Sequence, residues 1–363
     1  MYRFKYAFFF IIILIIMGSC DGWVKKILDP SERAKYERSF KGADSLMTRW
    51  KTEFSSASQN QLIIKDGHSA AVPQNGLYAL GYSIELQKGD LLMIEAESQD
   101  PLPRIFIDVY EQSSTAEPSK TELLKNGNFS RFTETGGIHK VIIQPEIDYQ
   151  GSFAFKIYTQ PSMAFPVAEK GNRDVQSFWG ASRDGGGRSH EGIDIFARRG
   201  TPVLATTSGY ITRTVNSGLG GKQVWQRDGL VGNSIYYAHL DSIMVQGGEQ
   251  VKTGDTLGLV GSTGNAEGGA PHLHFGIYTR GGAVDPYPYV RQRSVPAFKR
   301  AVIPHEKSVK AGSNLRSGPG TQYEILSALD QKTTVRVLAG DGEWFHIKTT
   351  TGLEGFVSGT RLE

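Results

Sequence analysis

Two histidines stand two positions apart in the stretch PHLHFGIY, which covers residues 271–278. Alternate side chains of an extended strand leave opposite faces, so His272 and His274 share one face and the apolar residues share the other. Two imidazoles side by side in an apolar strand need hydrogen-bond partners, a metal ion or solvent. The spacing therefore marks a candidate metal or catalytic strand, although H-x-H also occurs in several unrelated metallohydrolase folds.

A second pair of potential metal ligands is His190 and Asp194, in the stretch SHEGIDIF. Four residues of extended chain span roughly 13 Å, which is long for two ligands whose bonds to one zinc ion measure about 2 Å. Gly192 lies between them and permits a bend that would bring them together. Taken alone, H-x-x-x-D is more typical of a surface histidine and a turn aspartate.

The third histidine motif is IYYAHL, which ends one residue after His239. On a regular strand, Tyr237 would share a face with His239 while Tyr236 would point to the other side. A single histidine on a strand is more often an incidental polar residue than a catalyst. The motif gains weight only in combination with the other two.

Together the motifs satisfy what a hydrolytic zinc site needs. Such a site has three protein ligands and an open position for water, whose pKa the metal lowers to about 7. It also needs a base for the water's proton and a donor for the oxyanion. His190, Asp194 and one of His272 and His274 would complete the ligand set. The other member of that pair and His239 would be left for proton transfer and transition-state stabilisation.

The order of these motifs resembles that of the lysostaphin-type (LytM-type) zinc metallopeptidases, which cut peptides of bacterial peptidoglycan. This resemblance implies that His190, Asp194 and His274 bind one zinc ion and that His239 and His272 are catalytic. The matching segments are FWGASRDGGGRSHEGIDI, GTPVLATTSGYITRTV, IYYAHL, VKTGDTLGLVGSTGNAEGGAPHLHFGIY and VDPYPYV.

One segment departs from the family's pattern. SGLGGKQVWQRDGLVGN stands where family members carry a Val/Ile-rich strand and a His-Gly turn, so one wall of the cleft differs. No residue matches the upstream tyrosine that stabilises the oxyanion in some members. Arg183, Arg188 and Tyr237 remain candidates for the cleft, and a solvated surface role is expected for both arginines.

The N-terminus has the pattern of a secretory signal. Arg3 and Lys5 precede the apolar run 7–17, which is short for a membrane span. Gly18-Ser19 and Cys20, the only cysteine, follow and resemble a bacterial lipoprotein signal. We expect Cys20 to be lipidated and the protein to be exported as a membrane-anchored lipoprotein, periplasmic or facing the cell envelope. The alternative is an uncleaved N-terminal anchor.

The remaining chain is predicted to be mainly β and multidomain. Apolar residues alternate at Leu92, Ile94 and Ala96 and in several similar runs, which favours a β-sandwich. SNLRSGPGTQYEIL, EWFHIK and GLEGFVSGTRLE resemble a bacterial SH3-like domain. The expected units are a signal peptide (1–19), a helical linker (20–60), a β-sandwich (61–162), a Gly-rich antiparallel β-sheet peptidase (165–293), a linker (294–306) and a small SH3-like β-barrel (307–363).

Composition narrows the classes of partner. The 363 residues are 39% hydrophobic and 21% charged, as in soluble globular proteins, and the net charge is only +3. Without clustered Lys and Arg, no nucleic-acid partner is expected. The expected partners are peptidoglycan, and a membrane through lipidated Cys20, with the oligomeric state undetermined. The expected function is a zinc endopeptidase acting on peptidoglycan stem peptides or cross-links. The alternatives are a non-catalytic LytM-type activator of a cell-wall amidase and an autoinhibited wall-binding scaffold.

Overall fold

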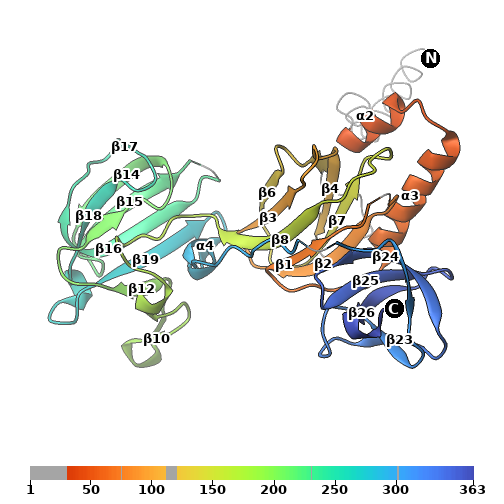
Figure 1. Cartoon of the computed structure of the whole chain (residues 1–363). Helices are drawn as coiled ribbons and strands as arrows, with labels where there is room; N and C mark the ends of the chain where they lie inside the picture. The colour runs from red at the N-terminus through yellow and green to blue at the C-terminus, as the bar shows by residue number, and fades with distance from the viewer. Residues whose placement is uncertain (1–30, 75, 112–120, 230, 301) are drawn as a thin grey trace, which may run out of the picture.

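The protein is mostly β, as predicted, with its few helices mainly near the N-terminus (Figure 1). Cys20 and the expected signal peptide lie outside the described residues. Every helix that the structure describes is too short or too polar to span a membrane. The computed structural model describes residues 31–363 except 75, 112–120, 230 and 301.

Two antiparallel sheets form the N-terminal sandwich. Their strands are β1 (His68–Ala71), β2 (Leu80–Leu86), β3 (Asp90–Glu97), β4 (Ile105–Glu111), β5 (Thr121–Leu123), β6 (Asn128–Phe132), β7 (Gly137–Pro145) and β8 (Ala154–Pro161). One sheet contains β1-β8-β3-β6 and the other β2-β7-β4-β5. The alternation predicted at Leu92, Ile94 and Ala96 is confirmed, because these side chains are buried in the core between the sheets.

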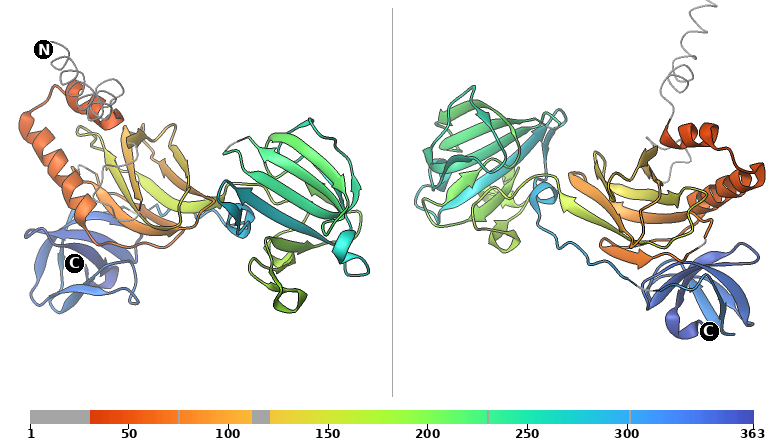
Figure 2. Two further views of the ribbon diagram at one scale, coloured as in Figure 1. Left: turned by 180° about the vertical axis from the view of Figure 1, so that it is seen from behind. Right: turned by 45° about the horizontal axis from the view of Figure 1, so that its top comes forward.

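Two helices cover the outer face of the second sheet. They are α2 (Glu32–Ser39) and α3 (Asp44–Gln59) (Figure 2). Trp50 of α3 is fully buried, and Arg33 of α2 pairs at 2.6 Å with Asp108 of β4, which is also fully buried. Both faces of β4 are therefore covered. The segment expected as a linker is helical, but its helices are a third packed layer, since the outward face of this sheet carries apolar residues that need a cover.

The middle of the chain forms a separate antiparallel sheet. Its strands are β9 (Val175–Ser177), β12 (Ile193–Phe196), β13 (Pro202–Leu204), β14 (Gly209–Asn216), β15 (Lys222–Asp228), β16 (Ser234–Ile243), β17 (Gln250–Val251), β18 (Thr256–Val260), β19 (His272–Thr279) and β20 (Gly282–Val284). The main order is β17-β14-β15-β16-β19-β12-β9. A hairpin of β10 (Ser182–Arg183) and β11 (Arg188–Ser189) precedes β12. The unit has its own apolar core.

The C-terminal unit packs against the N-terminal sandwich. Its strands are β21 (Glu306–Val309), β22 (Ser313–Arg316), β23 (Ile325–Leu329), β24 (Thr333–Gly340), β25 (Trp344–Thr349) and β26 (Glu354–Ser358). Ala71 of β1 pairs with Gly340 of β24, so one sheet runs through both units. Leu338 and Phe356 belong to the apolar core of the sandwich. The sandwich and the C-terminal unit thus form one body, with the middle sheet beside it (Figures 1 and 2).

A short helix, α4 (Tyr287–Val290), joins the middle sheet to that body. Tyr289 is 1% exposed and lies against Gly89, where a Cβ would come within 2.6 Å of the tyrosine ring. Arg293 forms an ion pair of 2.7 Å with Asp90 at the start of β3. The junction is therefore packed by both apolar and charged contacts.

Candidate metal centre

Strand pairing brings two of the three candidate ligands, Asp194 and His274, together. β12 and β19 are antiparallel, with Asp194 directly opposite His274. Their neighbours Ile193 and Phe275 are fully buried on the opposite face. Because the side-chain period of a strand is two, burial of the apolar face directs both polar side chains to the same open face. Register and burial together therefore place Asp194 beside His274.

His190 reaches this pair from the chain that leads into β12. Its backbone N–H donates to the carbonyl of Ala181 at 2.9 Å, which ties it to the preceding hairpin. Gly192 is needed because of space: a Cβ there would lie 2.6 Å from Cε1 of His274 and 2.6 Å from the carbonyl oxygen of Phe275. The sequence suggested conformational freedom at Gly192, but its φ is not positive. Close approach of two chain segments is the actual constraint.

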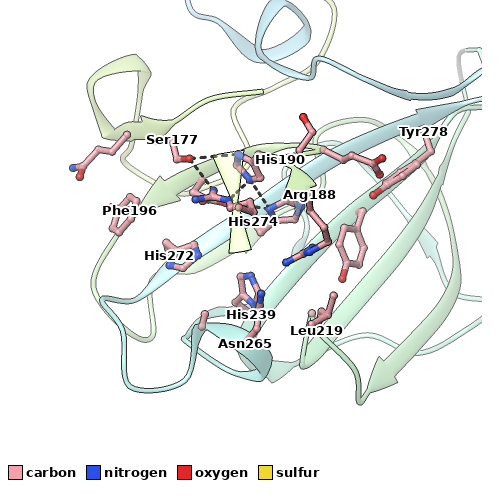
Figure 3. Close-up of a pocket in the computed structure, with 18 residues that line it drawn as sticks. Ser177, Arg188, His190, Phe196, Leu219, His239, Asn265, His272, His274 and Tyr278 are labelled. Atoms are coloured by element: carbon pink, nitrogen blue, oxygen red, sulfur yellow. Dashed lines mark hydrogen bonds and ion pairs between the residues drawn. The ribbon is translucent and has the colours of Figure 1, made fainter. Parts of the chain in front are cut away.

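Three donor atoms converge at one point. Nε2 of His190, Oδ1 of Asp194 and Nδ1 of His274 are each 3.0 Å from the other two. His190 and Asp194 are 4% and 6% exposed, and the His274 side chain is 15% exposed. These three residues form a group that could hold a metal ion. Figure 3 shows His190 and His274 facing each other across this point.

The donor set fits a cation. Nδ1 of His190 lies 2.9 Å from the carbonyl oxygen of Phe178, so this nitrogen carries the proton and Nε2 presents a lone pair. An ionised Asp194 presents a second lone pair to the same point. Atoms bound about 2 Å from one zinc ion in tetrahedral geometry lie about 3.3 Å apart, close to the separation here. Two imidazoles and one carboxylate are a ligand set typical of zinc.

The electrostatics of the group agree with metal ligation. Burial opposes ionisation of Asp194, but the contacts with His190 and His274 hold the pKa of its carboxyl well below the usual range. Burial lowers the pKa of His274, and Asp194 offsets only part of this effect. At neutral pH the aspartate is therefore charged and His274 neutral, which are the forms that bind metals.

The two remaining histidines lie next to this group. The rings of His239 and His272 are 5.0 Å apart, and those of His239 and His274 are 5.9 Å apart. Nδ1 of His239 lies 2.9 Å from the carbonyl oxygen of Thr263, and Nδ1 of His272 lies 2.9 Å from that of Ala270. Each Nδ1 therefore donates to the backbone, which leaves both Nε2 atoms available to a ligand. All five predicted site residues line one cleft.

His239 reaches the cleft because the strand is irregular there. Its φ is +62°, a left-handed value that is rare for residues other than glycine. The regular alternation predicted for β16 is therefore wrong at this point. Tyr237 is fully buried, its hydroxyl 2.7 Å from Oε1 of Gln226, whereas Tyr236 lines the cleft with His239. Tyr237 is thus a core residue, and Tyr236 is the cleft tyrosine that the sequence did not reveal.

The cleft has a volume of about 870 Å³ and opens to solvent. The segment that departs from the family's pattern, residues 217–233, contributes to one wall of the cleft. Leu219 of this segment lines the cleft and is 58% exposed. Tyr278 stands on the same side (Figure 3). Arg183 and Arg188, for which a solvated surface role was expected, both line the cleft. Nη2 of Arg183 lies 2.5 Å from Oδ2 of Asp194. The spacing of Arg183 and Asp194 in the sequence does not predict this contact, because the contact depends on how the β10–β11 hairpin folds.

Comparisons with known proteins find several relatives that match part of this chain. The chain is 37% identical over 141 residues to the L-Ala--D-Glu endopeptidase of Bacillus subtilis (strain 168), covering 35% of this chain and 43% of the relative. It is 37% identical over 112 residues to lysostaphin of Staphylococcus simulans, covering 29% and 22%. It is 41% identical over 99 residues to the DD-carboxypeptidase/endopeptidase Mpg of Neisseria meningitidis serogroup B (strain MC58), covering 27% and 22%.

The chain therefore spans less than half the length of each of these curated relatives. Among solved structures, the catalytic domain of lysostaphin from Staphylococcus simulans shares 33% sequence identity with a TM-score of 0.29, covering 32% of this chain and 92% of that one. Residues 188–286 match Peptidase family M23, and residues 311–363 match the Bacterial SH3 domain. This chain carries a Peptidase family M23 domain followed by a bacterial SH3 domain.

Proposed function

We propose that this protein is a zinc-dependent endopeptidase that hydrolyses peptide bonds in peptidoglycan stem peptides or cross-links. The observation that carries the proposal is the complete set of three converging donor atoms and two further histidines in one open cleft. The relatives named as endopeptidases support the reaction class. The complete donor set favours an enzyme over a non-catalytic activator of an amidase.

His190, Asp194 and His274 would hold the ion. When bound, zinc acts as a Lewis acid that polarises a carbonyl and lowers the pKa of water. His239 and His272 each present an Nε2 atom toward the cleft, since the Nδ1 atoms donate to backbone carbonyls. One of these Nε2 atoms can accept the proton of the attacking water, and a ring that has gained a proton at Nε2 can then donate to the oxyanion of the tetrahedral intermediate. Backbone anchoring keeps both rings oriented for these steps.

The cleft is accessible to an extended peptide. All residues that line it come from the middle unit, between Gln176 and Tyr278. Among the described residues, neither the sandwich nor the C-terminal unit contributes to the lining. This favours an open enzyme over a scaffold whose peptidase is closed by the sandwich. The SH3-like unit would bind the cell wall and hold the cleft near its substrate.

Export and lipid anchoring at Cys20 are part of the proposal. They rest on the basic start, the apolar run and the small residues before the lone cysteine. The protein would then act in the periplasm or facing the cell envelope. Mass spectrometry of the N-terminal peptide from membranes tests this: a diacylglycerol adduct is expected on wild type and none on Cys20→Ala. An intact, unmodified N-terminus in wild type would contradict it.

The central test uses soluble protein spanning residues 21–363. We expect about one bound zinc per chain by elemental analysis and release of muropeptides from purified peptidoglycan, identified by mass spectrometry. A chelator should abolish both, and added zinc should restore both. Zinc-loaded protein that releases no muropeptide from any of several defined peptidoglycans would overturn the enzyme proposal and favour the non-catalytic alternative.

A further inference from the structure

The two carboxylate oxygens of Asp194 have different partners. Oδ1 lies 3.0 Å from both His190 and His274, whereas Oδ2 lies 2.5 Å from Nη2 of Arg183. The Asp194 side chain is 8% exposed and that of Arg183 is 33% exposed. A hydrogen bond between a guanidinium and a carboxylate is charge-assisted and is among the stronger polar contacts in proteins. Oδ1 is thus directed at the candidate metal position, while Oδ2 is bound by the guanidinium of Arg183.

The guanidinium is itself held in place. Arg183 belongs to β10, which pairs with β11 in the hairpin before β12. The same Nη2 atom donates to Oγ of Ser177 at 2.8 Å. Ser177 is the β9 residue paired with Asp194, and its Oγ is 3.3 Å from Nδ1 of His190. Arg183 therefore connects the hairpin directly to Asp194 of β12 and, through Ser177 of β9, to His190.

We infer that Arg183 is a positioning residue of the metal centre, an inference that rests on the proposed zinc site. Its guanidinium fixes the rotation of the Asp194 carboxylate, so that Oδ1 faces the two imidazoles and Oδ2 is withheld from the metal. It also offsets the charge of a carboxylate that is buried before the metal arrives. Partners that orient metal ligands typically contribute 10–100-fold to metal affinity or activity.

Zinc affinity measured without substrate tests this role. Competition with a chromophoric chelator should show Arg183→Gln binding zinc 10–100-fold more weakly than wild type. Arg183→Lys keeps the charge but loses the planar fork, so we expect an intermediate loss. Arg173→Gln is the control, because the Arg173 side chain is 92% exposed and lies outside the cleft lining. Its zinc affinity should equal that of wild type.

A second readout separates positioning from simple stabilisation of the hairpin. The absorption spectrum of the cobalt(II)-substituted protein reports coordination number, and we expect Arg183→Gln to shift toward higher coordination as Oδ2 becomes free to bind. If Arg183→Gln lowers the melting temperature of the metal-free protein but keeps wild-type zinc affinity and spectrum, the inference fails. If wild type binds zinc tightly yet cleaves nothing, the proposed function fails while the inference stands.

Discussion

The hydroxyl of Tyr82 lies 3.1 Å from Nδ1 of His346, although 264 residues separate them in the chain. Tyr82 is in the N-terminal sandwich and His346 in the SH3-like unit, and both are fully buried. Lys348 extends the contact by pairing with Glu53 of α3 at 3.0 Å. Polar contacts therefore join the SH3-like unit to the sandwich and to α3, in addition to the apolar core that it shares with the sandwich.

Removal of the Tyr82 hydroxyl should destabilise both units together. Tyr82→Phe leaves the buried Nδ1 of His346 without its partner, so we expect a loss of about 1–3 kcal/mol in the free energy of unfolding. Calorimetry should show one transition for the sandwich and SH3-like unit, shifted downward in the variant. Tyr210→Phe is the control, because Tyr210 is 43% exposed in the middle unit. Separate transitions for the sandwich and the SH3-like unit would contradict the shared body.

Acid should destabilise the contact between the sandwich and the SH3-like unit through His68 of β1. Burial lowers the pKa of His68 from 6.5 to about 4, and nearby His346 lowers it further while Asp341 opposes the shift. Part of the residue is accessible, but its Nε2 atom is buried and has no hydrogen-bond partner among the described residues. Above pH 6.5 neither state binds the proton. As the pH falls from 6.5 to 4, only the unfolded state binds it, so stability decreases by up to about 3 kcal/mol.

Denaturant unfolding at pH 7.5, 6, 5 and 4.5 measures this effect. His68→Phe retains a ring among Tyr82, Phe155 and Phe356 and removes the titrating group. Its free energy of unfolding should fall less steeply over this range than that of wild type. Comparing slopes removes any constant change in stability that the substitution introduces. Equal slopes in the two proteins would show that His68 does not carry the acid sensitivity.

The two histidines of β19 should respond differently to substitution. His274 shares the 3.0 Å donor triangle, whereas His272 stacks on Phe196 and contributes no atom to the triangle. We expect His274→Ala to lose most zinc affinity and all turnover, because it removes a ligand. His272→Ala should retain zinc and lose turnover. Zinc stoichiometry and muropeptide release check both, and loss of zinc from His272→Ala would reverse the two assignments.

A methyl group at position 192 should disturb the metal centre without replacing any of its ligands. The Cβ of Gly192→Ala would meet the His274 ring and the Phe275 carbonyl at 2.6 Å, so β12 and β19 must move apart. We expect destabilisation of about 1–3 kcal/mol and weaker zinc binding. Gly281→Ala is the matched control, since its nearest neighbour would be 3.7 Å away. Wild-type zinc affinity in Gly192→Ala would show that the site tolerates this displacement.

Local patterns predicted much of the fold and the residue types of the candidate site, while the family resemblance supplied the role of each site residue. Period-two alternation in β3 identified a half-buried strand, and the same rule placed His272 and His274 on one face of β19. These inferences succeed because each depends on neighbouring residues of one strand and on the need to bury one face. The shared face of Tyr237 and His239 was wrong, because a left-handed residue breaks the period.

Contacts between distant segments were decided only by tertiary structure. The sequence determined a mostly β chain and the residue types of a candidate metal-binding cleft, since motifs and periodicity are properties of single segments. It did not reveal that Arg183 holds Asp194, that Tyr236 lines the cleft, or that the SH3-like unit shares a core with the sandwich. Each of these depends on strand register and on how separate units pack, which no single segment encodes.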